Sequence, residues 1–246
     1  MIEPGEGHLA SRLAAVGLED GVAAYLRMAR ELNPKGLGTD LEPLHLGLLP
    51  SYSSEFLDPF IRVELARYGW SADIWRGSFG EVESAIQEWT GPSETAPDAL
   101  VIHLRPEDLA PDTSLRFRSV TSRALEDLLD AVVERLLQTV DLYRSRGGLG
   151  PALVANLRPA QLPGSIMDAS DPGGPSHLVA KANLRLAELV DVEPGCYVWD
   201  HAGLVAAYGA LRWSDGRLWG LARTPIASDA QPYAAAHLAR SLSALL

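Results

Sequence analysis

The chain of 246 residues carries 21 basic and 32 acidic side chains, which give a formal net charge of −11 at pH 7. Such a charge repels nucleic acid and anionic membrane surfaces, so we expect neither as a partner. The single cysteine, Cys196, cannot form an internal disulfide, and the first residues, MIEPGEGHLA, lack the basic and apolar regions of a signal peptide. No apolar run approaches the roughly 18 residues of a membrane span. These features favour a cytoplasmic protein.

Residues 7–32 predict two short helices, because apolar side chains recur there every three to four positions. Pro34 and Gly36 then end the helical pattern. We therefore expect a helical leader over residues 1–40, followed by one α/β domain over residues 41–246. The leader shows no recognisable chemistry, and we expect it to pack on the sheet or to act as a docking hairpin.

The stretch from Leu44 to Trp70 predicts a strand, a turn and a helix. An apolar run ends at Leu49, the polar segment Pro50-Ser51-Tyr52-Ser53-Ser54 follows, and an amphipathic helical pattern begins at Phe56. In open α/β sheets, ligands bind where such turns leave the carboxyl ends of the strands. The hydroxyl groups of this turn are therefore the first candidates for chemistry.

Short apolar strands alternate with helical patterns along the rest of the chain. The expected strands are Ala72–Trp75, Ala99–Leu104, Ala152–Asn156 and Cys196–Trp199. The expected helices are 77–89, Ala124–Tyr143, Leu178–Val190 and Tyr233–Leu246, and Trp213–Trp219 is expected to form a small turn or hairpin. The long connection Leu157–His177 is either an ordered site loop or a disordered lid. The alternation predicts a three-layer α/β/α sandwich with a mainly parallel sheet.

The serines of the first turn have two interpretations. A nucleophile needs a tight turn, a nearby base and backbone N–H groups that stabilise an oxyanion, and Ser53 or Ser51 is suitably placed for that role. Ser53 or Ser54 is equally suited to cap the helix that follows.

Other candidate residues follow the later strands. Asn156 is either an oxyanion donor or a turn residue. Arg105 and Asp108 either bind an anionic group or form an ion pair with a helix-capping carboxylate. Asp200 is a further candidate for substrate binding, together with Ser51, and the adjacent His201 is a candidate base. Neighbouring side chains in an extended chain point apart, so Asp200 and His201 do not form a ready acid–base pair.

Two further residues are typical of structural roles. His103 lies inside an apolar strand and is more typical of a core residue, and Cys196 begins a buried strand as a packed thiol. No group of residues has the spacing of metal ligands, and no nucleotide-binding motif occurs.

Residues 44–80, LHLGLLPSYSSEFLDPFIRVELARYGWSADIWRGSFG, followed by DALVIHLRPEDL, resemble the amino-terminal domain of FkbH-like proteins of polyketide biosynthesis. That domain is similar to the SGNH (GDSL-type) hydrolases. Asn183 in KANLRLAEL, Asp200, and WSDGRLW with the following ARTP extend the resemblance from residue 44 to nearly the end. It implies an SGNH-hydrolase-like, flavodoxin-like fold.

The resemblance also implies a catalytic pattern. SGNH hydrolases use a serine after the first strand, a glycine and an asparagine for the oxyanion, and a late Asp-x-x-His as the base. Ser53 takes the serine's place, although Gly-Asp-Ser is absent, and Asn156 is available as the asparagine. Ser228 and Gln231 occupy the Asp and His places. Glutamine cannot exchange a proton near neutral pH, so the usual triad is broken and His201 is the best available base.

The implied function is acyl transfer or thioester hydrolysis on an acyl or glyceryl group held by an acyl carrier protein, with neither a cofactor nor a metal. FkbH-like proteins also contain a haloacid-dehalogenase-like domain, whose DxDxT motif is absent from this sequence, and such a domain is expected as a partner. The alternative is a non-catalytic carrier-protein docking or scaffold domain with a degenerate triad. Docking would need local arginines such as Arg62, Arg67 or Arg76. A third interpretation is a small-molecule esterase, which needs a complete base.

Overall fold

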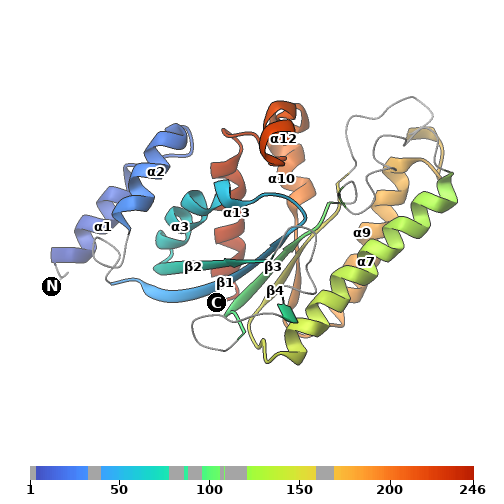
Figure 1. Ribbon diagram of the computed structural model, residues 1–246, viewed down its shortest axis with the longest axis horizontal. Helices are drawn as coiled ribbons and strands as arrows, with labels where there is room; N and C mark the ends of the chain where they lie inside the picture. Colours follow the sequence, from blue (N-terminus) through green and yellow to red (C-terminus); the bar gives the residue numbers. More distant parts are fainter. Residues whose placement is uncertain are drawn as a thin grey trace. The chain divides into compact units, whose positions relative to one another are not determined.

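A computed structural model describes residues 4–32, 40–77, 86–87, 96–105, 108, 121–158 and 169–246 (Figure 1). The strands are β1 (Glu42–Pro50), β2 (Trp70–Arg76), β3 (Ala99–His103), β4 (Ala152–Ala155) and β5 (Cys196–Trp199). The helices are α1 (Pro4–Ala14), α2 (Gly21–Glu31), the 3-10 turn η1 (Glu55–Leu57), α3 (Asp58–Ala66), α7 (Ser122–Ser145), α9 (Pro175–Asp191), α10 (His201–Tyr208), α11 (Ala210–Trp213), α12 (Gly216–Ala222) and α13 (Gln231–Ser243). Among the described helices, none is long and apolar enough to cross a membrane.

The five strands form one mainly parallel sheet in the order β2-β1-β3-β4-β5, with helices on both sides. The parallel register pairs Leu100 of β3 with Ala152 of β4, and Ala152 with Cys196 of β5. Every side chain of β3 and β4 is buried, as expected for central strands covered on both faces. The predicted α/β sandwich is confirmed.

The short apolar runs of the sequence correspond closely to the strands, and the periodic segments correspond to the helices. The predicted helix over 77–89 falls largely outside the described residues, as does the middle of the connection Leu157–His177. The prediction for Trp213–Trp219 is wrong, because this segment contains the end of α11 and the start of α12. Asp215 and Gly216 resemble a hairpin turn, but the Asp215 carboxylate instead caps α12 by accepting the N–H of Arg217 at 2.8 Å.

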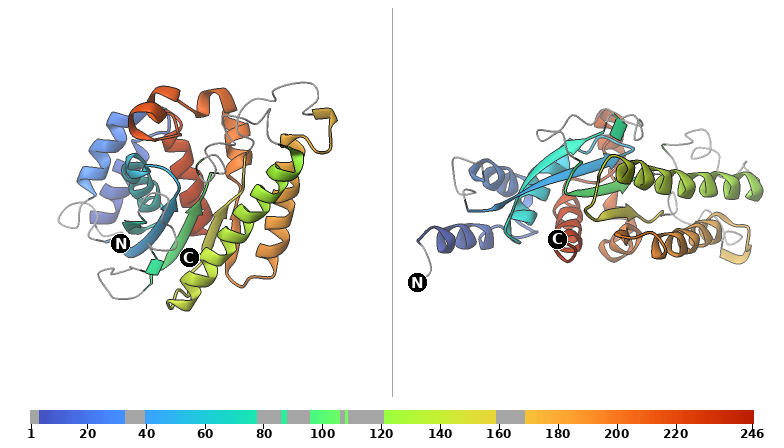
Figure 2. Two further views of the ribbon diagram at one scale, coloured as in Figure 1. Left: turned by 45° about the vertical axis from the view of Figure 1, so that its right-hand side comes forward. Right: turned by 90° about the horizontal axis from the view of Figure 1, so that it is seen from below.

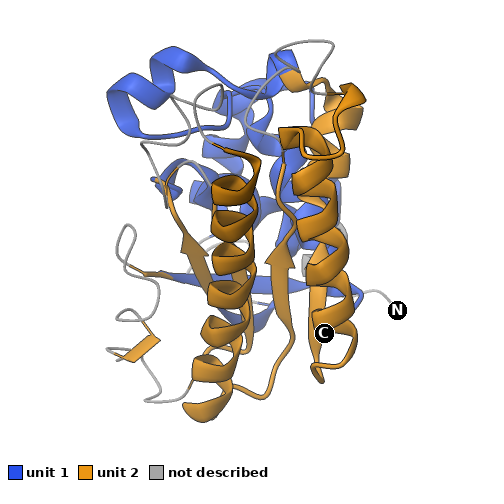
Figure 3. Cartoon of the chain, turned by 90° about the vertical axis from the view of Figure 1, so that its right-hand side faces the viewer, with its two compact units in different colours: residues 1–46, 53–75, 211–246 blue, residues 47–52, 76–210 orange. Residues whose placement is uncertain are grey.

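The chain divides into two compact units (Figure 3). Unit 1 consists of Met1–Leu46, Ser53–Trp75 and Leu211–Leu246, and unit 2 consists of Gly47–Tyr52 and Arg76–Ala210. The division into a leader over residues 1–40 and a domain over 41–246 stays a prediction.

In unit 2 the long helices α7 and α9 lie side by side (Figure 2). The Thr121 hydroxyl starts α7 by accepting the N–H of Ala124 at 3.3 Å. The buried side chains of α7 recur every three to four residues, so one stripe of the helix faces the core and the opposite stripe faces solvent. On the exposed side, Arg185 of α9 forms an ion pair with Asp130 of α7 at 2.6 Å.

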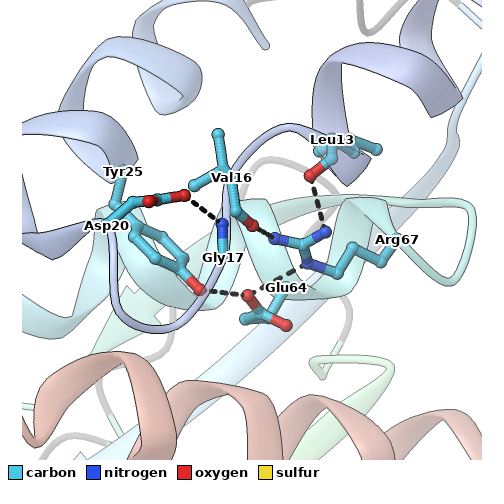
Figure 4. Close-up of polar contacts among 7 residues, drawn as sticks. All are labelled: Leu13, Val16, Gly17, Asp20, Tyr25, Glu64 and Arg67. Atoms are coloured by element: carbon cyan, nitrogen blue, oxygen red, sulfur yellow. Dashed lines mark hydrogen bonds and ion pairs between the residues drawn. The ribbon is translucent and has the colours of Figure 1, made fainter.

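In unit 1 the leader helices are attached to α3 by buried polar contacts (Figure 4). The Arg67 guanidinium donates to the carbonyl of Leu13 at 2.7 Å, to the carbonyl of Val16, and to Glu64 at 3.0 Å. The Tyr25 hydroxyl donates to the same Glu64 carboxylate at 2.6 Å, and burial followed by this hydrogen bond raises the pKa of Tyr25. One arginine therefore satisfies the backbone where α1 ends, and its carboxylate partner holds α2.

We expect Arg67→Ala to lower the free energy of unfolding by about 2 kcal/mol, because it leaves buried carbonyls and the Glu64 carboxylate without their donor. Arg12→Ala is the matched control. Arg12 forms an ion pair with Glu31 between exposed side chains, and such pairs contribute less than about 1 kcal/mol. Urea denaturation of both variants measures the difference. An Arg67→Ala variant no less stable than Arg12→Ala would contradict this role.

Candidate functional site

Polar residues gather in unit 2 just after the carboxyl ends of its strands. Tyr52 follows β1, Arg105 follows β3, Asn156 follows β4, and His201 follows β5. Because parallel strands end at the same edge of a sheet, side chains far apart in the sequence meet there. The Ser51 N–H donates to the carbonyl of His103 at 3.2 Å, which extends the pairing beyond the end of β1.

The centre of this edge is a buried cluster of Tyr52, His103, Trp199 and His201. Each of these residues is at most 4% exposed. The Tyr52 hydroxyl lies 2.7 Å from Nδ1 of His103. The His103 ring packs against the His201 ring at 4.1 Å between centroids and against Trp199 at 5.4 Å, both edge to face. We call these four residues the imidazole cluster.

Burial shifts the pKa values of two members of the imidazole cluster. It raises the pKa of Tyr52, so the hydroxyl stays protonated while it shares a hydrogen bond with Nδ1 of His103. Burial also lowers the pKa of His103 well below its usual value, and the charges of His201, Arg105 and Arg158 lower it further. His103 is therefore a neutral hydrogen-bonded group and not a general acid at neutral pH.

Ser51 is held by the segment that follows β3. Its hydroxyl donates to the Asp108 carboxylate at 2.7 Å and accepts the backbone N–H of Arg105 at 2.9 Å. Arg105 and Asp108 form an ion pair at 3.6 Å, with the Asp108 side chain 5% exposed. Ser51, itself 1% exposed, therefore has a hydroxyl that is both covered and fully engaged.

Asn156 connects the end of β4 to the start of α10. Its amide N–H donates to Asp200 at 2.7 Å, and its amide oxygen accepts the N–H of Ala202 at 2.7 Å. Asp200 caps α10 by accepting the N–H of Gly203 at 2.9 Å. A Cβ at Gly203 would lie 2.1 Å from the capping carboxylate, so only glycine fits there.

Asn183 of α9 fixes the chain that follows Asn156. Its amide accepts the N–H of Leu157 at 2.8 Å and donates to the carbonyl of Leu157 at 2.7 Å. The asparagine thus takes the place of a neighbouring strand just beyond β4. This arrangement sets the direction in which the chain enters Arg158.

Ser53, Ser54 and Gln231 belong to unit 1. The Ser53 backbone is held on both sides: its N–H donates to the carbonyl of Arg223 at 3.1 Å, and its carbonyl accepts the Thr224 hydroxyl at 3.3 Å. Ser54 is 1% exposed and precedes η1 without a side-chain capping bond. Gln231, at the start of α13, is buried and donates to the carbonyl of Ile226 at 3.3 Å.

The structure brings some of the predicted site residues together. Ser51, Arg105 and Asp108 form one bonded group, and Asn156 is bonded to Asp200. His201 is the first residue of α10 and lies against His103. Ser53 belongs to the other unit. The catalytic and binding roles assigned to these residues stay predictions.

The sequence reasoning did not assign a role to Tyr52 and treated His103 as a core residue. Their positions could have indicated a role for both residues. Tyr52 and His103 lie at the carboxyl ends of neighbouring strands, close in sequence to the candidate residues Ser51 and Arg105. Cys196 is a packed thiol, as predicted, and burial raises its pKa to about 11. Within the described part of the chain, no group of three or more His, Cys, Asp or Glu residues is arranged to hold a metal ion.

No protein-family model and no curated protein matches the chain. Among solved structures, it is similar to the N-terminal part of the protein BF1531 from Bacteroides fragilis, which contains a phosphatase domain complexed with Mg. That match has a TM-score of 0.68 and 20% identity, and it covers 87% of this chain and 55% of the other. The chain thus spans about half the length of that structure.

A second similar structure is the lipase Lip_vut3 from a goat rumen metagenome. The TM-score is 0.55 at 12% identity, and the match covers 82% of this chain and 97% of the lipase. The two likenesses support the mainly parallel α/β fold of this chain.

The lowered pKa of His103 predicts a loss of stability in mild acid. The unfolded imidazole binds a proton as the pH falls below about 6.5, whereas the buried imidazole does not, so acid favours the unfolded state. We expect the free energy of unfolding of the natural protein to decrease between pH 7.5 and 5.5, with a part on the order of 1 kcal/mol due to His103. His103→Gln retains a hydrogen-bonding partner for Tyr52. It removes the contribution of His103 to the pH dependence of the free energy of unfolding.

Urea denaturation at the two pH values measures this difference. His8→Gln removes an exposed imidazole and is the control. We expect its free energy of unfolding to depend on pH as that of the natural protein does. Equal pH dependence in the natural protein and in His103→Gln would show that His103 does not contribute.

Proposed function

We propose that the chain is an SGNH-like, FkbH-related domain that transfers or hydrolyses an acyl or glyceryl group carried as a thioester on an acyl carrier protein. The observation that carries the proposal is the state of the serines after β1. Ser51 is buried with its hydroxyl bonded to Asp108 and Arg105, and Ser54 is buried. Ser53 alone among these three keeps a partly exposed side chain. It is also anchored through both backbone groups, as a nucleophile on a fixed turn must be.

In this proposal Ser53 attacks the thioester carbonyl, and the carrier's thiolate leaves. A base must take the serine proton, and Gln231 cannot do so, because its amide does not titrate and is engaged with the carbonyl of Ile226. The resulting acyl-serine then passes its acyl group to water or to an acceptor hydroxyl. The resemblance to FkbH-like proteins is the reason to propose this reaction as a step of bacterial polyketide biosynthesis. The lipase of similar fold supports ester chemistry as the general class.

We expect Ser53→Ala to abolish both labelling by a fluorophosphonate and release of the acyl group from an acylated carrier protein, with a rate at least about 1000-fold below that of the natural protein. Ser54→Ala is the matched control, since its hydroxyl is buried one residue away. Mass spectrometry locates the label, and thiol release measures turnover. Unlabelled natural protein that leaves the carrier acylated would eliminate the catalytic proposal.

A second candidate is a non-catalytic carrier-protein docking or scaffold domain. It is favoured by the amide side chains of Gln231 and Asn156, which are already hydrogen-bonded within the protein. Gln231 holds a backbone carbonyl where the family's base would stand, and Asn156 is bonded at both ends of its amide. Such a domain would present an acyl carrier protein to a phosphatase-like domain of the haloacid dehalogenase type. The phosphatase domain of the BF1531 structure motivates that partner.

For docking on unit 1, Arg62 is the arginine to test, because Arg67 is engaged with Leu13, Val16 and Glu64. Carrier proteins are usually acidic, so we expect Arg62→Glu to weaken carrier binding about tenfold by calorimetric titration. Arg30→Glu places the same charge change on the exposed side of α2. Equal losses in the two variants would indicate overall charge and not a docking face.

A further inference from the structure

Two arginines follow neighbouring parallel strands of unit 2. Arg105 lies two residues beyond His103, where β3 ends, and Arg158 lies three residues beyond Ala155, where β4 ends. The register pairs Ile102 with Val154, so the two strands reach their carboxyl ends at the same level. Both arginines therefore lie at the edge of the sheet where α/β proteins bind their ligands.

The two guanidinium charges act on the same buried groups. Both lower the pKa of Tyr52 and that of His103, whereas the Asp108 carboxylate raises that of Tyr52. The positive charges that act on His103 contrast with the net charge of −11 of the whole chain.

The backbone at both arginines is fixed by side chains. The Ser51 hydroxyl holds the N–H of Arg105, and Asn183 holds both backbone groups of Leu157, the residue before Arg158. The carboxylates nearby have partners of their own. Asp108 accepts from Ser51 and pairs with Arg105, and Asp200 accepts from Asn156 and caps α10. Because the backbone is already fixed at both positions, only the two side chains lose conformational freedom when a ligand binds.

We propose that Arg105 and Arg158 form a subsite for an anionic group, a phosphate or a carboxylate, on the ligand of unit 2. Guanidinium groups recognise both anions through paired N–H donors. The bound anion offsets the positive potential at His103, so its binding changes the imidazole NMR signals of the imidazole cluster. The subsite goes beyond the acyl chemistry proposed above and does not depend on whether Ser53 is a nucleophile.

The experiment is a titration of the natural protein with sodium phosphate and, separately, with sodium acetate at constant ionic strength, followed by the imidazole NMR signals of His103 and His201. We expect saturable shifts of these signals with at least one of the two anions. Tighter binding of phosphate assigns the subsite to a phosphoryl group, and tighter binding of acetate assigns it to a carboxylate. Absence of a saturable shift with both anions would overturn the proposal.

Arg158→Gln is the decisive variant, because loss of Arg105 also removes the ion pair of the buried Asp108 and destabilises the fold. We expect Arg158→Gln to weaken anion binding about tenfold or more, and Arg158→Lys to recover part of it. Arg185→Gln removes the same charge from the exposed surface of α9 and should leave binding unchanged. Unaltered binding in Arg158→Gln, or an equal loss in Arg185→Gln, would refute the subsite.

The titration is repeated with Ser53→Ala protein. Anion binding there together with loss of acyl release supports both proposals. Anion binding by a natural protein that releases no acyl group supports the subsite and rejects only the catalytic function.

Discussion

The hydrogen bond from Tyr52 to His103 is the constraint on which the candidate site of unit 2 depends. A buried hydroxyl and a buried imidazole are each costly without a partner, and here each satisfies the other at 2.7 Å. The bond links the turn after β1 to β3 and orients the ring of His103. His201 and Trp199 pack against that ring from the end of β5. Three strands thus contribute to one buried polar centre.

This constraint also determines which hydroxyl groups of the first turn are available. Tyr52 points into the imidazole cluster, and the preceding residue, Ser51, is bonded to the segment that follows β3. Both side chains are therefore structural, although either hydroxyl suits a catalytic role by residue type alone. Burial and hydrogen bonding select among chemically similar neighbours, and they leave Ser53 as the accessible hydroxyl.

The strands and most helices could be predicted from the spacing of apolar residues, because that spacing indicates which faces of a helix or strand are buried. The segment around Asp215 was misjudged because Asp-Gly suits a turn and a helix start equally well. The Tyr52–His103 pair was missed for a different reason. Its formation depends on the register and order of β1 and β3, which local sequence patterns do not determine. Candidate residues were therefore found by position, but their bonding partners were not.

The amide side chains of this chain hold its backbone at several element ends. Gln231, the first residue of α13, donates to the carbonyl of Ile226 and so satisfies a buried acceptor without a titratable group. Asn183 uses both ends of its amide to hold the backbone of Leu157, and Asn156 holds the N–H of Ala202 with one end and the Asp200 carboxylate with the other. An amide keeps the hydrogen bonds of an ionisable residue and gives up its proton transfer. These amides are therefore structural, and a carboxylate takes the same part next to them, where Asp200 caps the helix that begins at His201.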